Sequence, residues 1–99
     1  TAHILRYIRA FMGDEAITPA IDFVDDYAMS YGVFSPEMAD CASRMMRLYG
    51  LPLDLTYTGK AFYGMLEEIR KRNYQGQNVL FLHTGGTPLF FDKVGVSIL

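Results

Sequence analysis

Residues 77–88 decide how the chain is interpreted, and they read Gln77-Asn78-Val79-Leu80-Phe81-Leu82-His83-Thr84-Gly85-Gly86-Thr87-Pro88. The apolar run from Val79 to Leu82 predicts a buried β-strand that stops at a polar turn with two glycines. In α/β proteins, ligands bind at the loops that follow the carboxyl ends of strands. Paired glycines let the backbone approach a ligand closely, and Thr84 and Thr87 can hydrogen-bond it. We therefore expect a binding site directly after this strand.

One helix in the middle of the chain is marked by residues at both of its ends. Ser35 is the expected N-cap and Pro36 the expected first helical residue, because proline has no backbone N–H to leave unpaired there. Gly50 and Pro52 are expected to end the helix. The sequence therefore predicts a helix between Pro36 and Gly50.

Three further elements follow from the apolar pattern. Apolar residues at helical spacing from Ile4 to Met12 predict an N-terminal helix. A strand is expected from Ala20 to Val24. Another helix should begin at Thr58 or Gly59 and run to about Asn73. Helices flanked by strands are typical of an α/β sheet with crossover connections.

Size and composition indicate one incomplete domain. The chain has 99 residues, of which 51% are hydrophobic and 14% aromatic. A freestanding domain of this length has little interior for so many phenylalanines and tyrosines. The chain also begins with Thr1 rather than Met, directly in a helical pattern. We expect residues 1–99 to be a single partial domain of a larger protein.

Charge and cysteine content exclude several classes of function. A net charge of −2 leaves no basic stripe for nucleic acid. No apolar run approaches the roughly 20 residues that span a bilayer, so no membrane partner is expected. Neither His3 nor His83 has a partner at metal-ligand spacing. The lone Cys41 suits a reducing compartment, and we expect the cytoplasm, or an organelle if a transit peptide precedes the chain.

Three motifs together resemble one enzyme family. They are Tyr57-Thr58-Gly59-Lys60-Ala61, then His83-Thr84-Gly85-Gly86-Thr87-Pro88, and upstream Val24-Asp25-Asp26-Tyr27 followed by Tyr31-Gly32. In their order along the chain, across about residues 20–91, these motifs resemble the C-terminal part of the D-cysteine desulfhydrase / 1-aminocyclopropane-1-carboxylate deaminase family. These are fold-type-II enzymes that use pyridoxal 5'-phosphate (PLP). The resemblance implies an α/β fold, namely the C-terminal part of a tryptophan synthase β-like, three-layer α/β/α domain, in a homodimeric enzyme.

The resemblance also implies roles for three side chains. Thr84 matches the residue that faces the pyridine nitrogen of PLP, which makes it a candidate cofactor-binding residue. Tyr57 and Tyr31 match two tyrosines near the substrate and are candidate catalytic residues that orient the amino acid and carry protons. From the residues alone, Thr84 could instead cap a turn or the following helix, and both tyrosines could be packing residues.

Two parts of the family's machinery are missing from these 99 residues. The family places its Schiff-base lysine near the N-terminus of the enzyme and its phosphate loop in the middle of the chain. Lys60 is therefore expected to bond local structure rather than the cofactor, and His83 is expected to be a structural residue at a strand end. We expect no activity from residues 1–99 alone, which need the remainder of the enzyme chain.

The sequence departs from the family at two turns. Asp54-Leu55-Thr56 stands where the family commonly has Asp-Pro-Val, and Ser30-Tyr31-Gly32 replaces Gly-Tyr-Gly. Thr58 resembles the desulfhydrase branch, because the deaminase branch tends to carry Glu there. The expected reaction is α,β-elimination of D-cysteine, or a related small amino acid, to pyruvate, ammonia and sulfide. The alternatives are ring-opening deamination of 1-aminocyclopropane-1-carboxylate, and a non-catalytic remnant that packs, dimerises or regulates.

Overall fold

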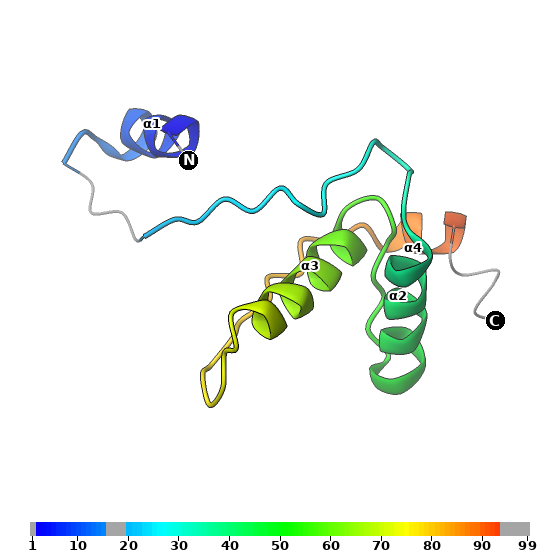
Figure 1. The fold of residues 1–99 in the computed structure, drawn as a ribbon. Coiled ribbons are helices and arrows are strands. Elements are labelled where there is room, and N and C mark those ends of the chain that lie inside the picture. The colour runs from blue at the N-terminus through cyan, green and yellow to red at the C-terminus, as the bar shows by residue number, and fades with distance from the viewer. Residues whose placement is uncertain (1, 16–19, 94–99) are drawn as a thin grey trace.

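The protein is helical throughout the part of the chain that its structure describes. The computed structural model describes residues 2–15 and 20–93, and these contain four helices and no β-strand. The helices are α1 (Ala2–Met12), α2 (Pro36–Tyr49), α3 (Thr58–Lys71) and α4 (Thr87–Lys93). Figure 1 shows α2 and α3 meeting in a V, with α4 beside the upper end of α2. The first helix, α1, stands apart at the far end of a long extended segment.

Helix α2 confirms the prediction made from its ends. The side chain of Ser35 accepts a hydrogen bond from the Met38 amide at 3.2 Å, and Pro36 is the first helical residue. Gly50 ends the helix in the left-handed conformation, with φ of 64°. Glycine adopts this conformation without the steric cost that a Cβ atom brings. The prediction for α3 is also confirmed, since that helix begins at Thr58 and ends two residues before Asn73.

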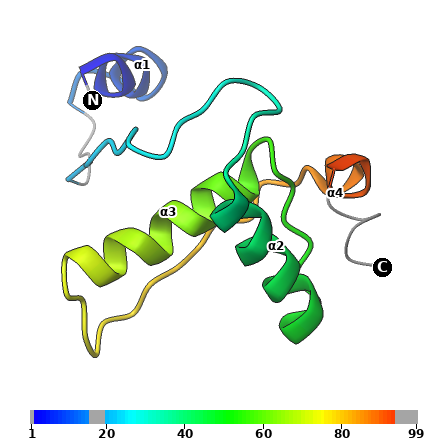
Figure 2. The same ribbon diagram turned by 45° about the vertical axis from the view of Figure 1, so that its right-hand side comes forward.

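The prediction of an α/β fold is wrong for the described residues. Residues 20–24 and 79–82 have no strand partner there, and both run as single extended segments. Figure 2 shows the chain between α3 and α4 running back along α3 without a neighbour to form a sheet. An apolar run indicates that a segment is buried or extended, but a strand also needs a second segment to hydrogen-bond with. The three-layer α/β/α architecture is therefore corrected to a small helical arrangement.

The core is small and lies where α2, α4 and the α2–α3 connection meet. Its buried apolar residues are Met38, Ala42, Leu53, Leu55 and Phe90. Helix α1 adds nothing to it: none of its residues is buried, and Phe11 is 93% exposed. The segment before α4 is also largely uncovered, with Leu80 92% and Leu82 77% exposed. Within the described residues, none of the helices is both long and apolar enough to cross a bilayer.

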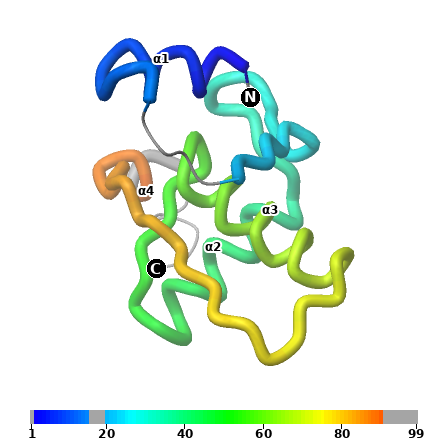
Figure 3. The backbone as a smooth tube through the Cα atoms, turned by 90° about the vertical axis from the view of Figure 1, so that its left-hand side faces the viewer, coloured from blue at the N-terminus to red at the C-terminus, as the bar shows by residue number. Residues whose placement is uncertain are grey.

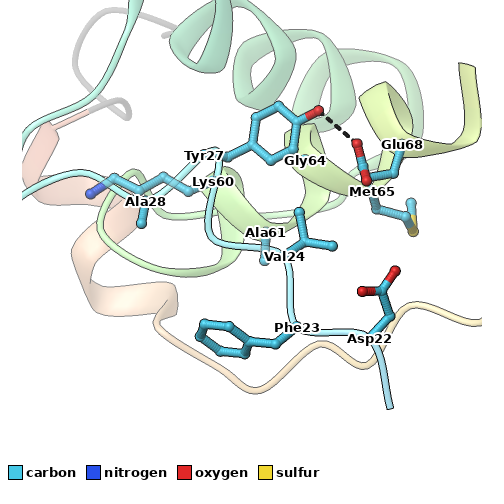
Figure 4. Close-up of a pocket in the computed structure, with 10 residues that line it drawn as sticks. All are labelled: Asp22, Phe23, Val24, Tyr27, Ala28, Lys60, Ala61, Gly64, Met65 and Glu68. Atoms are coloured by element: carbon cyan, nitrogen blue, oxygen red, sulfur yellow. Dashed lines mark hydrogen bonds between the residues drawn. The ribbon is translucent and has the colours of Figure 1, made fainter. Parts of the chain in front are cut away.

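The ring of Tyr27 packs on Gly64, and this contact, called the Tyr27–Gly64 interlock below, holds the extended segment of residues 20–28 against α3. Figure 4 shows the Tyr27 ring over Gly64, with its hydroxyl bonded to the Glu68 carboxylate at 3.0 Å. The Lys71 ammonium also donates to the Tyr27 hydroxyl, at 2.8 Å. A Cβ atom at Gly64 would lie 2.8 Å from Cδ2 of Tyr27, closer than such atoms can approach. The glycine is therefore needed for this ring to pack on the helix.

Replacing Gly64 with Ala tests the interlock. Alanine normally stabilises a helix by about 1 kcal/mol relative to glycine. Here we expect the opposite sign, a loss of about 1–2 kcal/mol, because the Tyr27 ring must move. The measurement is urea unfolding of Gly64→Ala in the native chain and in a Tyr27→Ala background. In that background the alanine should stabilise, and equal effects in both backgrounds would contradict the interlock.

Candidate functional site

Three turns that are far apart in the sequence meet at the N-terminal end of α3. They are residues 30–32, residues 54–59 and residues 83–86. Figure 3 shows the chain just before α4, in orange, passing close to the green connection that leads into α3. Since helices and turns bring these segments together without a sheet, the site depends on side-chain contacts between the turns.

A set of hydrogen bonds within the turn of residues 54–59 centres on Asp54, whose side chain is fully buried. Its Oδ2 accepts hydrogen bonds from the amides of Thr56 at 2.8 Å and Tyr57 at 2.6 Å. Its Oδ1 accepts from the amide of Thr58 at 3.1 Å and from the Thr58 hydroxyl at 2.6 Å. The Thr58 hydroxyl in turn accepts from the Asp54 amide at 3.0 Å. The carboxylate thus accepts from the amides of the two residues before α3 and of its first residue, Thr58, which has no partner within the helix.

These bonds determine the charge of Asp54. Burial by itself raises the pKa of a carboxyl group, but the bonds from the Thr58 hydroxyl and the three amides outweigh it and lower the pKa of Asp54 below its ordinary value. Asp54 is therefore an anion at neutral pH. Its two oxygens already accept four bonds, close to the capacity of a carboxylate. The Asp54 carboxylate is therefore not free to bind a further group.

The third turn lies directly on this carboxylate. Gly86 has φ of 83°, and a Cβ atom there would collide with Oδ1 of Asp54. Between the two turns is a hollow of about 250 Å³. Its lining residues are Asp54, Tyr57, Thr58, Thr84, Gly85, Gly86 and Leu89. Close approach at a glycine therefore shapes one wall of the hollow.

All three candidate site residues lie at or next to this hollow. Tyr57 and Thr84 line it, and the ring of Tyr31 meets the ring of Tyr57 edge-on at 6.0 Å between centroids. Lys60 holds the turn of residues 30–32 in place, because its ammonium donates to the carbonyl of Ser30 at 3.2 Å. Lys60 is buried and bonds local structure, as expected from the sequence. The structure brings these residues together but does not test their roles.

The hollow fits a neutral ring better than a phosphate. Its lining includes one anion, Asp54, and no Lys, Arg or His. The hydroxyl of Thr84 is a donor and acceptor that remains available at the mouth, where the side chain is exposed. The residues present therefore suit the pyridine ring of PLP facing Thr84. They do not suit its phosphate, which needs cations or free amides.

Sequence reasoning missed Asp54 as a residue that builds the site, and it gave His83 only a structural role at the end of a strand that the described residues do not contain. A signal for Asp54 was present: an Asp with threonines two and four residues later, just before a helix, is typical of a side chain that bonds the first amides. His83 carried no comparable signal. Its partners, the Pro52 carbonyl at 2.8 Å and the Gly85 amide at 3.1 Å, could not be inferred from spacing.

No protein-family model matches the chain, and no solved structure matches it. The interpretation of the site therefore depends on its geometry and on the three motifs.

Proposed function

We propose that the chain is the C-terminal part of a PLP-dependent lyase of the D-cysteine desulfhydrase kind. The reaction is α,β-elimination, in which D-cysteine and water give pyruvate, ammonia and hydrogen sulfide. The observation that supports it is the hollow that Tyr57 and Thr84 share, with Tyr31 against Tyr57. Residues from two distant turns line the hollow, and Tyr31 from a third turn contacts Tyr57 beside it. The proposal concerns the site's chemistry and does not depend on a sheet.

Each side chain has a role that its position supports. PLP, when bound, supplies the electron sink that lets the substrate lose its Cα proton and its β-thiol. The Thr84 hydroxyl hydrogen-bonds the pyridine nitrogen, and as a neutral group it does not force that nitrogen to be protonated. The Tyr57 and Tyr31 hydroxyls orient the substrate carboxylate and transfer a proton to the departing sulfur. Asp54 binds no ligand and holds Tyr57 through its amide.

The partners follow from the same proposal. They are a small amino acid, the remainder of the enzyme chain, and a second copy in a homodimer. The large exposed apolar side chains of α1 and of residues 79–82 support a protein partner, because soluble monomers seldom expose contiguous apolar surface. The cytoplasm is the compartment we propose, since the lone Cys41 is a buried free thiol.

The test is the visible absorbance spectrum of the full-length protein, before and after addition of D-cysteine. We expect an absorption band from bound PLP that changes with substrate, together with release of sulfide. Residues 1–99 alone should show neither, because they lack the family's cofactor-holding lysine. A full-length protein that stays colourless with added PLP would contradict the proposal. Release of 2-oxobutanoate from 1-aminocyclopropane-1-carboxylate, without sulfide from D-cysteine, would assign the deaminase reaction instead.

Tyr57→Phe in the full-length protein tests the role of the phenol. We expect kcat to fall by about 10²–10⁴, the usual contribution of a positioned acid or base, while the PLP spectrum is retained. Tyr49→Phe is the matched control, because Tyr49 is an exposed tyrosine at the end of α2 away from the hollow. An unchanged elimination rate in Tyr57→Phe would remove Tyr57 from proton transfer.

A non-catalytic interaction domain is the second candidate function. The exposed apolar residues favour it, because α1 presents an apolar stripe that no described residue covers. Such a domain would bind its partner through α1 whether or not PLP is present. Analytical ultracentrifugation of the full-length protein and of its Phe11→Asp variant, both without PLP, distinguishes the two. Association that is lost in the variant, in a protein without lyase activity, would support this second function.

A further inference from the structure

The imidazole of His83 joins the turn of residues 83–86 to the segment that leads into α3. One ring nitrogen, Nε2, lies 2.8 Å from the carbonyl oxygen of Pro52. The other, Nδ1, accepts a hydrogen bond from the Gly85 amide at 3.1 Å. Pro52 lies two residues before Asp54, so a single side chain spans the two turns that form the hollow.

The two partners together determine which nitrogen carries the proton. A carbonyl oxygen can only accept, so Nε2 must be protonated. A backbone amide can only donate, so Nδ1 must be unprotonated. Both bonds form at once only in the neutral Nε2–H tautomer. The Phe81 ring meets the imidazole edge-on at 6.4 Å and packs in turn on Phe62, which limits rotation of the ring.

Thr84 lies between His83, which carries the ring, and Gly85, whose amide the ring bonds. Gly85 has φ of 112°, a conformation that glycine adopts more easily than other residues, and the hydrogen bond from its amide to the imidazole holds it there. The direction of the Thr84 side chain is therefore set by the imidazole rather than by a helix or a sheet.

We propose that His83, as the neutral Nε2–H tautomer, is a positioning residue that directs Thr84 into the hollow. The inference rests on the proposed function, because Thr84 is assigned there to the pyridine nitrogen of PLP. The tautomer of His83 and its hold on the turn follow from the two hydrogen bonds alone. A displacement of about 1 Å at a positioning group can lower a rate by about 100-fold, so the effect is measurable.

Two substitutions separate the two bonds. In His83→Asn, the side-chain oxygen takes the place of Nδ1 and can still accept from the Gly85 amide. In His83→Gln, the terminal amide takes the place of Nε2 and can still donate to Pro52, but the acceptor for Gly85 is lost. The proposal is that the bond to the Gly85 amide fixes the position of Thr84. Thr84 should therefore keep its position in His83→Asn and lose it in His83→Gln.

The first measurement uses the full-length protein without cofactor. NMR of the ¹⁵N-labelled histidine ring should show the proton on Nε2. Hydrogen exchange of the Gly85 amide should be at least about tenfold faster in His83→Gln than in the native chain and in His83→Asn. A proton on Nδ1, or a Gly85 amide that exchanges freely in the native chain, would overturn the proposal even if His83→Gln failed to fold.

The second measurement uses the full-length protein with PLP. We expect His83→Gln to lower kcat about 10- to 100-fold with little change in KM and to shift the PLP absorption band, and His83→Asn to recover most of the loss. Equal kcat and spectra in both variants would overturn the positioning role. If the NMR results hold but no variant or native protein binds PLP, the proposed function fails and the bond to Gly85 is only structural.

Discussion

Replacing Asp54 with Ala is expected to lower the free energy of unfolding by about 3–5 kcal/mol, the largest effect of any single substitution outside the apolar core. The carboxylate accepts three amides and one hydroxyl, and alanine would leave these donors unpaired in a buried place. Urea unfolding followed by circular dichroism measures the change. The hollow should be lost as well, because the amide of Tyr57 is one of the groups that Asp54 holds.

Asp40→Asn is the matched control, because Asp40 is an exposed carboxylate on α2 that forms an ion pair with Arg44, at 4.0 Å. Its effect should stay within about 0.5 kcal/mol.

The Asp54→Asn variant tests how the stabilisation by Asp54 depends on pH. The folded pKa of Asp54 is lowered, so its stabilisation is complete above the unfolded pKa of about 3.9 and is lost as the pH falls through the folded value. The difference between native and Asp54→Asn chains should therefore be smaller at pH 3 than at pH 7, and an equal difference would contradict the lowered pKa.

Gly86→Ala is expected to have the second largest effect, a loss of about 2–4 kcal/mol. Part of the loss is backbone strain, because φ of 83° is unfavourable for any residue with a Cβ atom. The rest comes from collision of that atom with the buried Oδ1 of Asp54. Thermal or urea unfolding measures the loss, and titration of the full-length protein with PLP should show weaker binding, because the turn must withdraw from the hollow.

Gly85→Ala is the control for backbone strain. Gly85 also has a positive φ, 112°, but a Cβ atom there meets nothing within 4 Å. We therefore expect a loss from strain alone, about 1–2 kcal/mol. Equal losses at the two glycines would mean that the Asp54 carboxylate does not support the turn.

The helices could be predicted from the sequence because their signals are local. Ser35, Pro36 and Gly50 mark the ends of α2 within the helix itself, and the structure places each in the expected role. The helix α4 was not predicted as an element, although a helix after Thr84 was considered as one reading of that residue. Its seven residues give too short a pattern for periodicity to detect.

The strands could not be predicted correctly because pairing is not local. Val79 to Leu82 is apolar and does adopt an extended path, but nothing in the segment states whether a partner strand exists. In the described residues the partner is an aromatic side chain instead, since Phe81 meets Phe62 at 5.1 Å. The four apolar residues therefore predicted that the backbone is extended, but they could not predict whether it pairs into a sheet.

The site lies between these two cases. The motifs led to Tyr57, Thr84 and Tyr31 as a group, and the structure places Tyr57 and Thr84 in the lining of one hollow, with Tyr31 against Tyr57. The sequence could not show that a buried carboxylate and an imidazole hold the turns together. Those contacts join residues about 30 positions apart, and only the folded chain brings them into range.

The edge-on contact between Tyr31 and Tyr57 also has an optical consequence. The chain contains no tryptophan, so its near-ultraviolet signal comes chiefly from seven tyrosines. Two pairs of these rings are in contact, Tyr31 with Tyr57 and Tyr27 with Tyr63 at 5.9 Å, and rings in a fixed, asymmetric arrangement are expected to dominate the circular dichroism there. The chain thus carries an intrinsic chromophore at the hollow, and its Tyr31→Phe difference spectrum reports whether the turns have assembled without any added label.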